Sequence, residues 1–270
     1  MTRPLSIAHL SAIDLTPPTL IETAAKAGLD AVGLRLIKVT PDSPGYPLWQ
    51  DAQMMRDTKD ALQNFGLRVN DIEFVKVTED TTAESLLPFF NCGAELGAKT
   101  AILAPYDDDL SRLAETIASL SEAAQERGIG VVLEFFPWTS VPDLQTCWQV
   151  VQAAGEDVGL LVDSLHFDRS GSSHDLLAQI PAERMPFLHL CDAPVQDSYT
   201  TEELLHTARG ERFAPGDGQI DLAAFLKAAP NAPIGLEIPR PTALSPEGYV
   251  ERFADFAAKT RALTKEVGAE

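Results

Sequence analysis

Four polar side chains interrupt apolar runs in the second half of the sequence, and all four are of types that bind metal ions. Glu134 ends "VVLE", Asp163 ends "LLVD", His189 lies in "FLHL" and Glu237 ends "IGLE". Three carboxylates and one imidazole form an oxygen-rich ligand set that suits Mn2+, with Mg2+, Co2+ or Zn2+ as alternatives. Buried together without a cation, such acids would raise one another's pKa and lower stability. The pattern therefore predicts a divalent metal site.

A histidine follows one of these acids at short spacing, in "DSLH". His166 lies three residues after Asp163, where a buried strand is expected to end. This spacing places its imidazole close to the metal without making it a ligand. We expect a general acid or base, or a hydrogen-bond partner of the substrate. The structural alternative is a residue that only orients Asp163, just as each acid alone has a structural explanation in a buried ion pair.

The elements that must position these residues are eight short apolar runs separated by amphipathic segments. Almost wholly apolar strands alternating with helices are typical of a parallel sheet covered by helices. No Gly-x-Gly-x-x-Gly follows the first run, which disfavours a dinucleotide-binding fold. We predict one (β/α)8 TIM barrel over residues 1–270, in which the carboxyl ends of the strands meet at the active site. The eight runs are 5–10, 31–37, 69–75, 100–106, 130–136, 158–164, 187–192 and 233–239.

One connection is longer than the others and polar, from about residue 193 to 219. Long connections often act as lids or binding loops. Arg209 and Arg212 lie in it and are candidates to hold a substrate carboxylate or phosphate, since the guanidinium fork suits both groups. Two solvated loop charges are the competing interpretation. Gly216 and Gly218 are expected to shape a turn.

Single polar residues near other strand ends are weaker substrate-contact candidates. They are Arg35 in "GLRLI", His9 in "IAHL" and Glu73 in "DIEF". Trp138, just beyond Glu134, is expected to cover an apolar side of the pocket. Packing alone would explain each of them equally well.

Composition excludes several classes of function. The chain has 21 Lys and Arg against 40 Asp and Glu, a net charge of -19, which disfavours nucleic acid and anionic membrane surfaces as partners. Three distant cysteines indicate neither a disulfide framework nor a thiolate metal site. Without a signal-like or membrane-spanning apolar segment, we expect a cytoplasmic protein that acts on a small-molecule substrate. The sequence is compatible with a homo-oligomer.

The segments around these residues are similar to a known family. They are "LEFFPW", "VDSLHFDRSG", "LHLCDAP" and "LEIPRP". They resemble the xylose isomerase-like TIM-barrel superfamily, over nearly the whole chain and most specifically over 130–240. The resemblance implies one Mn2+ or Mg2+ held by Glu134, Asp163, His189 and Glu237. By similarity to the epimerases, the two glutamates would lie on opposite faces of the substrate and move its proton through an enediolate.

A second branch is also similar. "FLHLCDAP" followed by "ARGERFAPGDGQIDL" looks like 3-dehydroshikimate dehydratase domains, in which the histidine of "DSLH" would protonate a departing hydroxyl. We therefore expect a metal-dependent sugar or sugar phosphate isomerase or epimerase, with a dehydratase-like lyase as the alternative. A non-catalytic metal-bound ligand sensor is a third alternative.

Overall fold

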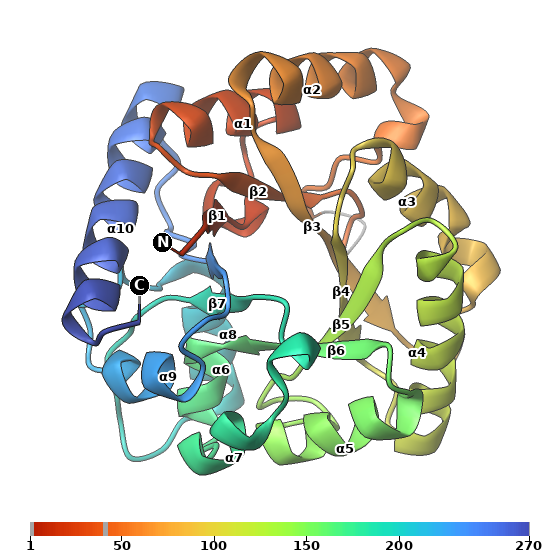
Figure 1. Cartoon of the computed structure of the whole chain (residues 1–270), viewed down its shortest axis with the longest axis vertical. Coiled ribbons are helices and arrows are strands. Elements are labelled where there is room, and N and C mark those ends of the chain that lie inside the picture. The colour runs from red at the N-terminus through yellow and green to blue at the C-terminus, as the bar shows by residue number, and fades with distance from the viewer. Residues whose placement is uncertain (1–2, 40–42, 270) are drawn as a thin grey trace.

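Eight parallel strands close into a barrel in the order of the sequence, β1 to β8 (Figure 1). This structure is a computed structural model and describes residues 3–39 and 43–269. Each strand falls within or around one of the predicted apolar runs, so the prediction of a (β/α)8 barrel is confirmed. The strands are β1 Leu5–Ile7, β2 Ala31–Arg35, β3 Arg68–Val77, β4 Thr100–Pro105, β5 Gly130–Glu134, β6 Val158–Asp163, β7 Leu188–Leu190 and β8 Ile234–Leu236.

Helices connect the strands and surround the barrel as an outer ring (Figure 1). They are α1 Pro17–Lys26, α2 Ala52–Phe65, α3 Ala83–Glu95, α4 Leu110–Gln125, α5 Leu144–Ala154, α6 Ser164–Arg169, α7 His174–Gln179, α8 Thr201–Gly210, α9 Leu222–Ala228 and α10 Pro246–Glu266. Short 3-10 turns are η1 His9–Ala12, η2 Leu48–Gln50 and η3 Ala182–Arg184. Within the described residues, no helix combines the length and apolar character needed to cross a bilayer.

Side chains of the strands alternate between two apolar cores. One large core packs between the barrel and its helices and includes Val131, Leu133, Leu160 and Val162. A separate small cluster consists of Ile102, Val132, Leu161 and Phe187. Because neighbouring residues of a strand point to opposite faces, this second cluster fills the inside of the barrel. It forms an apolar floor beneath the next inward-facing residues, two positions further along each strand.

The segment 193–219, expected to be a long loop, contains helix α8. Thr200 caps its start: the Thr200 hydroxyl accepts from the backbone N–H of Glu203, and the Glu203 carboxylate accepts from the backbone N–H of Thr200. This reciprocal capping box stabilises a helix start. The S/T-x-x-E motif of a capping box is present in "TTEE", so the sequence contains a local signal for this helix start.

Candidate active site

The four candidate ligands come together at the carboxyl ends of β5 to β8. Glu134 and Asp163 are the last residues of β5 and β6, His189 is central in β7, and Glu237 directly follows β8. The register pairs Asp163 with His189 and His189 with Gly235. Each side chain offers one ligand atom, the four atoms all lie within 4.8 Å of one another, and all four residues are buried. This cluster could hold a divalent metal ion.

His189 lies at the centre of the cluster through its Nδ1 atom. That atom is 3.7 Å from Glu237 Oε2, 3.9 Å from Glu134 Oε1 and 4.0 Å from Asp163 Oδ2. Among the described residues, neither ring nitrogen of His189 nor Oε1 of Glu134 has a hydrogen-bond partner. Buried polar atoms without partners are rare and destabilising. A cation that binds Nδ1 and Oε1 would satisfy both, so the donor set fits the expected metal.

The charges of the protein alone point the same way. Burial raises the pKa of Glu134 well above its usual value, and the nearby Glu237 carboxylate raises it further. Burial alone would lower the pKa of His189, but the carboxylates of Glu237 and Glu134 outweigh it and raise the pKa to about 10. Both groups therefore favour their protonated forms. The cluster attracts positive charge, which is the electrostatic property of a cation site.

Arg212 occupies a different position from the one expected of a substrate clamp. Its side chain is 2% exposed, and its Nη1 atom donates to Asp163 Oδ2 at 2.5 Å while Nη2 lies 2.8 Å from Glu237 Oε2. Burial alone would raise the pKa of Glu237, but Arg212 and His189 outweigh that effect and lower it. Arg212 thus holds two of the candidate ligands and offsets their charge. This cation reaches the cluster from the connection after β7 rather than from a strand.

Asp192 fixes the part of that connection that carries Arg212. Its carboxylate accepts hydrogen bonds from the backbone N–H groups of Gly216, Gly218 and Ile220, each at 3.0 Å. Its backbone pairs with Phe213 in both directions. A Cβ atom on Gly218 would lie 2.3 Å from Asp192 Oδ1, so this close approach requires glycine. Asp192 was assigned no role from the sequence, although "CDAP" and "APGDG" carry the signal.

The position of His166 is set by a helix start. Asp163 is the N-cap of α6, and its Oδ1 atom accepts from the backbone N–H of Leu165 at 2.7 Å. The helix that starts there brings His166 back toward the cluster, with Nε2 3.9 Å from Glu134 Oε1. Burial lowers the pKa of His166 to about 4, so its ring is neutral at pH 7. The rings of Phe136 and Trp138 contact it edge-on, with centroids at 4.8 and 5.2 Å.

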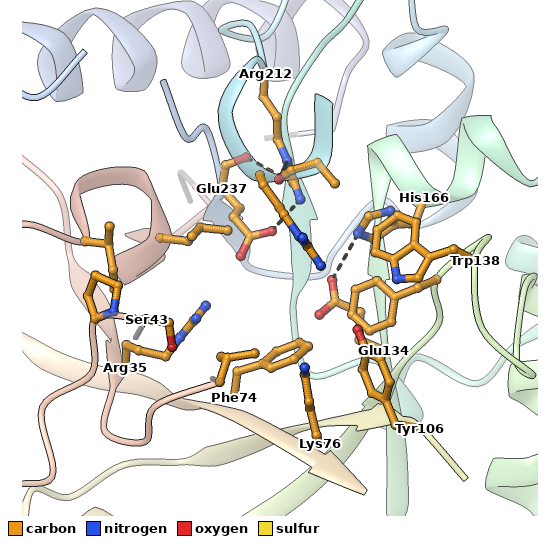
Figure 2. Close-up of a pocket in the computed structure, with 17 residues that line it drawn as sticks. Arg35, Ser43, Phe74, Lys76, Tyr106, Glu134, Trp138, His166, Arg212 and Glu237 are labelled. Carbon is orange, nitrogen blue, oxygen red and sulfur yellow. Dashed lines mark hydrogen bonds and ion pairs between the residues drawn. The ribbon is translucent and has the colours of Figure 1, made fainter. Parts of the chain in front are cut away.

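A pocket of about 300 Å³ opens above the cluster. Of the four candidate ligands only Glu134 and Glu237 line it, whereas Asp163 and His189 lie beneath. Figure 2 shows Glu134, His166 and Trp138 together on one side and Arg212 with Glu237 on another. The volume is at the small end for ligand sites. The remaining lining residues are Leu10, Ile13, Arg35, Val39, Ser43, Pro44, Phe74, Lys76, Tyr106, Phe136, Trp138, His166, Ala208, Arg209 and Arg212.

The weaker sequence candidates divide into two groups. Arg35 and Trp138 line the pocket, as does Arg209 of α8. Glu73 is 1% exposed and does not line it; its Oε1 atom lies 3.4 Å from Arg35 Nε. Glu73 therefore forms a buried ion pair with Arg35 instead of facing the pocket.

His9 also differs from the expectation of a substrate contact. His9 begins the 3-10 turn η1 just after β1, is fully buried and does not line the pocket. Its Nδ1 atom accepts from the backbone N–H of Arg35 at 3.0 Å, and Nε2 lies 2.8 Å from the carbonyl of Leu15. The ring stacks on Tyr46. Both nitrogens are occupied by backbone, so His9 is part of the core.

The fold agrees with that of a known family. The sequence profile of the xylose isomerase-like TIM barrel family matches residues 21–260, most of the chain. The chain belongs to this family.

Relatives of characterised function fall into two groups. The chain is 31% identical over 163 residues to an inosose isomerase of Bacillus velezensis, and 32% identical over 152 residues to a 3-dehydroshikimate dehydratase of Pseudomonas aeruginosa. These matches cover 57% and 56% of the chain. They span 53% of the isomerase and 22% of the dehydratase, and so only part of either relative.

Solved structures share the fold at lower identity. A xylose isomerase-like TIM barrel/4-hydroxyphenylpyruvate dioxygenase fusion protein superposes with a TM-score of 0.79 at 21% identity, over 96% of this chain and 42% of that one. The IOLI protein with a bound zinc atom superposes with a TM-score of 0.78 at 20% identity, over 98% of this chain and 99% of that one. At such identities the likeness concerns the fold.

Proposed function

We propose that the protein is a divalent-metal-dependent isomerase or epimerase that forms an enediolate from a small polyhydroxylated carbonyl compound. The observation that carries the proposal is that two buried carboxylates, Glu134 and Glu237, face one small pocket above a cluster of metal-ligand type. Removing a proton and returning it elsewhere needs two such groups within reach of one substrate. The similarity to inosose isomerases supports this class of reaction.

The metal would be held by Glu134, Asp163, His189 and Glu237. Three oxygen ligands and one nitrogen favour Mn2+, with Mg2+, Co2+ or Zn2+ as alternatives. The zinc atom of the structurally similar IOLI protein supports a metal in a barrel of this kind. When bound, the ion would supply Lewis-acid polarisation of the substrate carbonyl, which acidifies the neighbouring C–H bond.

The side chains of this chain would then move the proton. Glu134 and Glu237 take it from one carbon and return it to another, or to the opposite face of the same carbon. His166, neutral at pH 7 and 3.9 Å from Glu134 Oε1, exchanges a proton with a substrate hydroxyl or donates a hydrogen bond to it. The rings of Phe136 and Trp138 cover His166 and limit its contact with water.

A 3-dehydroshikimate dehydratase-like lyase is the second candidate, favoured by the 32% identity to the Pseudomonas enzyme. The first step is the same proton removal. The resulting enolate would then expel a β-hydroxyl, which His166 would protonate as it leaves. The two candidates diverge only after the common step.

One experiment separates them. The Mn2+-loaded protein is incubated in D2O with ketoses, their phosphates and 3-dehydroshikimate, and each reaction is followed by NMR. Deuterium entering beside the carbonyl with a new sugar is the expected result and establishes an isomerase or epimerase. New aromatic signals from 3-dehydroshikimate instead establish the dehydratase. Absence of metal-dependent exchange with every compound favours the ligand sensor.

A further inference from the structure

The pocket has opposite charges in different parts of its wall. Glu134 and Glu237 lie at the metal-ligand cluster, whereas Arg35, Lys76 and Arg209 line the wall from β2, β3 and α8. Figure 2 shows Arg35, Phe74, Lys76 and Tyr106 along one edge and Arg212 with Glu237 at the opposite edge. In a chain with 40 acidic and 21 basic residues, a pocket lined by four Lys and Arg but two Glu departs from the average. Such a wall attracts anions.

The four cations are not equally available. Arg212 is engaged by Asp163 and Glu237, and Arg35 by Glu73. Lys76 and Arg209, in contrast, have no acidic partner among the residues that the structure describes. The Lys76 ammonium lies 4.7 Å from the centre of the Tyr106 ring. Partial burial lowers the pKa of Lys76, and the charge of Arg209 lowers it further.

Two neighbouring cations that face one cavity repel each other, and an anion between them removes that repulsion. The pocket, at about 300 Å³, accommodates one small metabolite. A molecule whose carbonyl lies at Glu134 and Glu237 therefore also reaches the other wall. A neutral sugar would leave both cations without a partner.

We propose that Lys76 and Arg209 form an anion subsite, so that the substrate is a small carbonyl compound with a carboxylate or phosphate group at the end away from the two glutamates. This inference rests on the proposed function for the position of the carbonyl. It adds Lys76, which lies beyond the apolar run that marks β3 in the sequence. The sequence pairs Arg209 with Arg212 as anion-binding candidates; in the subsite proposed here, Lys76 takes the place of Arg212.

Two matched pairs of compounds test the subsite. They are fructose 6-phosphate with fructose, and 3-dehydroshikimate with its methyl ester; binding to the Mn2+-loaded protein is measured by calorimetry. One charge-assisted hydrogen bond is worth about ten- to a hundredfold in affinity. We expect an anion to bind at least about tenfold more tightly than its neutral partner. The pair that shows the preference identifies phosphate or carboxylate as the group bound.

Substitutions of Lys76 and Arg209 test whether these residues cause the preference for the anion. Lys76→Met should remove most of it and leave the affinity for the neutral partner unchanged, while Lys76→Arg should retain part of it. Lys227→Met on α9 is the matched control, because it removes the same charge from an exposed residue outside the pocket lining. Should Lys76→Met unfold, Arg209→Gln, at a solvent-exposed residue of the pocket lining, gives the same test.

Subsite and reaction can fail separately. Equal binding of charged and neutral partners, or a preference that survives both Lys76→Met and Arg209→Gln, overturns the subsite even if deuterium exchange occurs. A preference for anions that these variants abolish supports the subsite even if no compound exchanges deuterium, in which case the proposed reaction fails alone.

Discussion

Two successive layers inside the barrel use the same strands for opposite purposes. Val132, Leu161 and Phe187 belong to the apolar floor, and two residues further along β5, β6 and β7 come Glu134, Asp163 and His189. Both layers are almost completely buried. Burial stabilises the apolar floor, because its side chains leave water without losing hydrogen bonds. The same burial destabilises the ionisable layer, which consists of Glu134, Asp163, His189 and Glu237, unless cations offset the carboxylates.

Along each strand, the apolar residue that stabilises the barrel and the ionisable residue are thus two positions apart. Packing of the floor holds the strands in place, and this fixes the positions of the ionisable side chains that follow on the same strands. Changes in the floor should therefore alter stability first, and changes in the ionisable layer should alter activity first. Substitutions in each layer can test this separation.

The largest effect is expected in the ionisable layer. Glu237→Gln should lower kcat/KM by about a thousandfold or more, because it removes a proposed proton carrier that is also a proposed metal ligand. Metal content measured by atomic absorption should fall, and circular dichroism should show that the variant remains folded. Glu251→Gln on α10, an exposed acid, is the control. Full activity of Glu237→Gln would refute its assignment.

The floor should respond in the opposite way. Phe187→Ala should lower the free energy of unfolding by about 3–5 kcal/mol through lost burial and a cavity. Chemical denaturation measures this loss. Below the unfolding transition, metal affinity should stay within a few-fold of its original value. A variant that melts normally but no longer binds metal would mean that the two layers are not separable.

Arg212 offsets the charge of Asp163 and Glu237, so its removal should destabilise the metal-free protein most. Arg212→Met leaves the buried carboxylates of Asp163 and Glu237 without their cation. This should lower the free energy of unfolding of the protein by about 3 kcal/mol. Added Mn2+ should restore much of that loss. The measurement is the difference in melting temperature with and without metal, which should be larger in the variant. An equal difference in both proteins would contradict this role.

The smallest effect is expected at His9, one of two buried histidines with different surroundings. Both ring nitrogens of His9 have backbone partners, whereas those of His189 have no hydrogen-bond partner among the described residues. Burial lowers the pKa of His9 to about 4, below its usual 6.5. The unfolded chain then binds a proton more readily, so His9 lowers stability as pH falls through 6.5 toward 4. Between about pH 7 and 5 this amounts to about 2 kcal/mol.

His9→Asn tests that contribution by denaturation at the two pH values. The stability of the variant should vary less with pH than that of the unchanged protein, at similar activity at neutral pH. An identical pH dependence in both proteins would show that His9 does not titrate as inferred.

The clustering of the four candidate ligands could be predicted from the sequence because its signal is local. Glu134, Asp163, His189 and Glu237 each interrupt an apolar run, and strand alternation with barrel closure brings such interruptions together. The barrel itself was predicted from the same pattern. Both predictions needed only the period of the strands and the common direction of a parallel sheet.

Other residues depended on contacts that the sequence does not display. The position of Arg212 depends on the hydrogen bonds of Asp192 to a turn more than twenty residues away. Lys76 was missed because β3 continues past Val75 to Val77, beyond the end of its apolar run. His9 was misplaced for another reason, since it is spaced by two from Leu5 and Ile7, whose side chains pack outside the barrel. Strand ends, unlike strand centres, are set by tertiary contacts.

The pairing of Asp192 with Phe213 closes a detour of the chain at its base, and α8 lies inside that detour. Arg212 is beside the base, whereas Arg209 belongs to the detour itself. Side-chain changes on α8 leave this backbone pairing intact, but Arg212 is tied to the helix because its Nε donates to the carbonyl of Ala208 at 3.0 Å. Changes to exposed side chains of this helix should therefore alter Arg209 and the pocket wall before they alter the four candidate ligands.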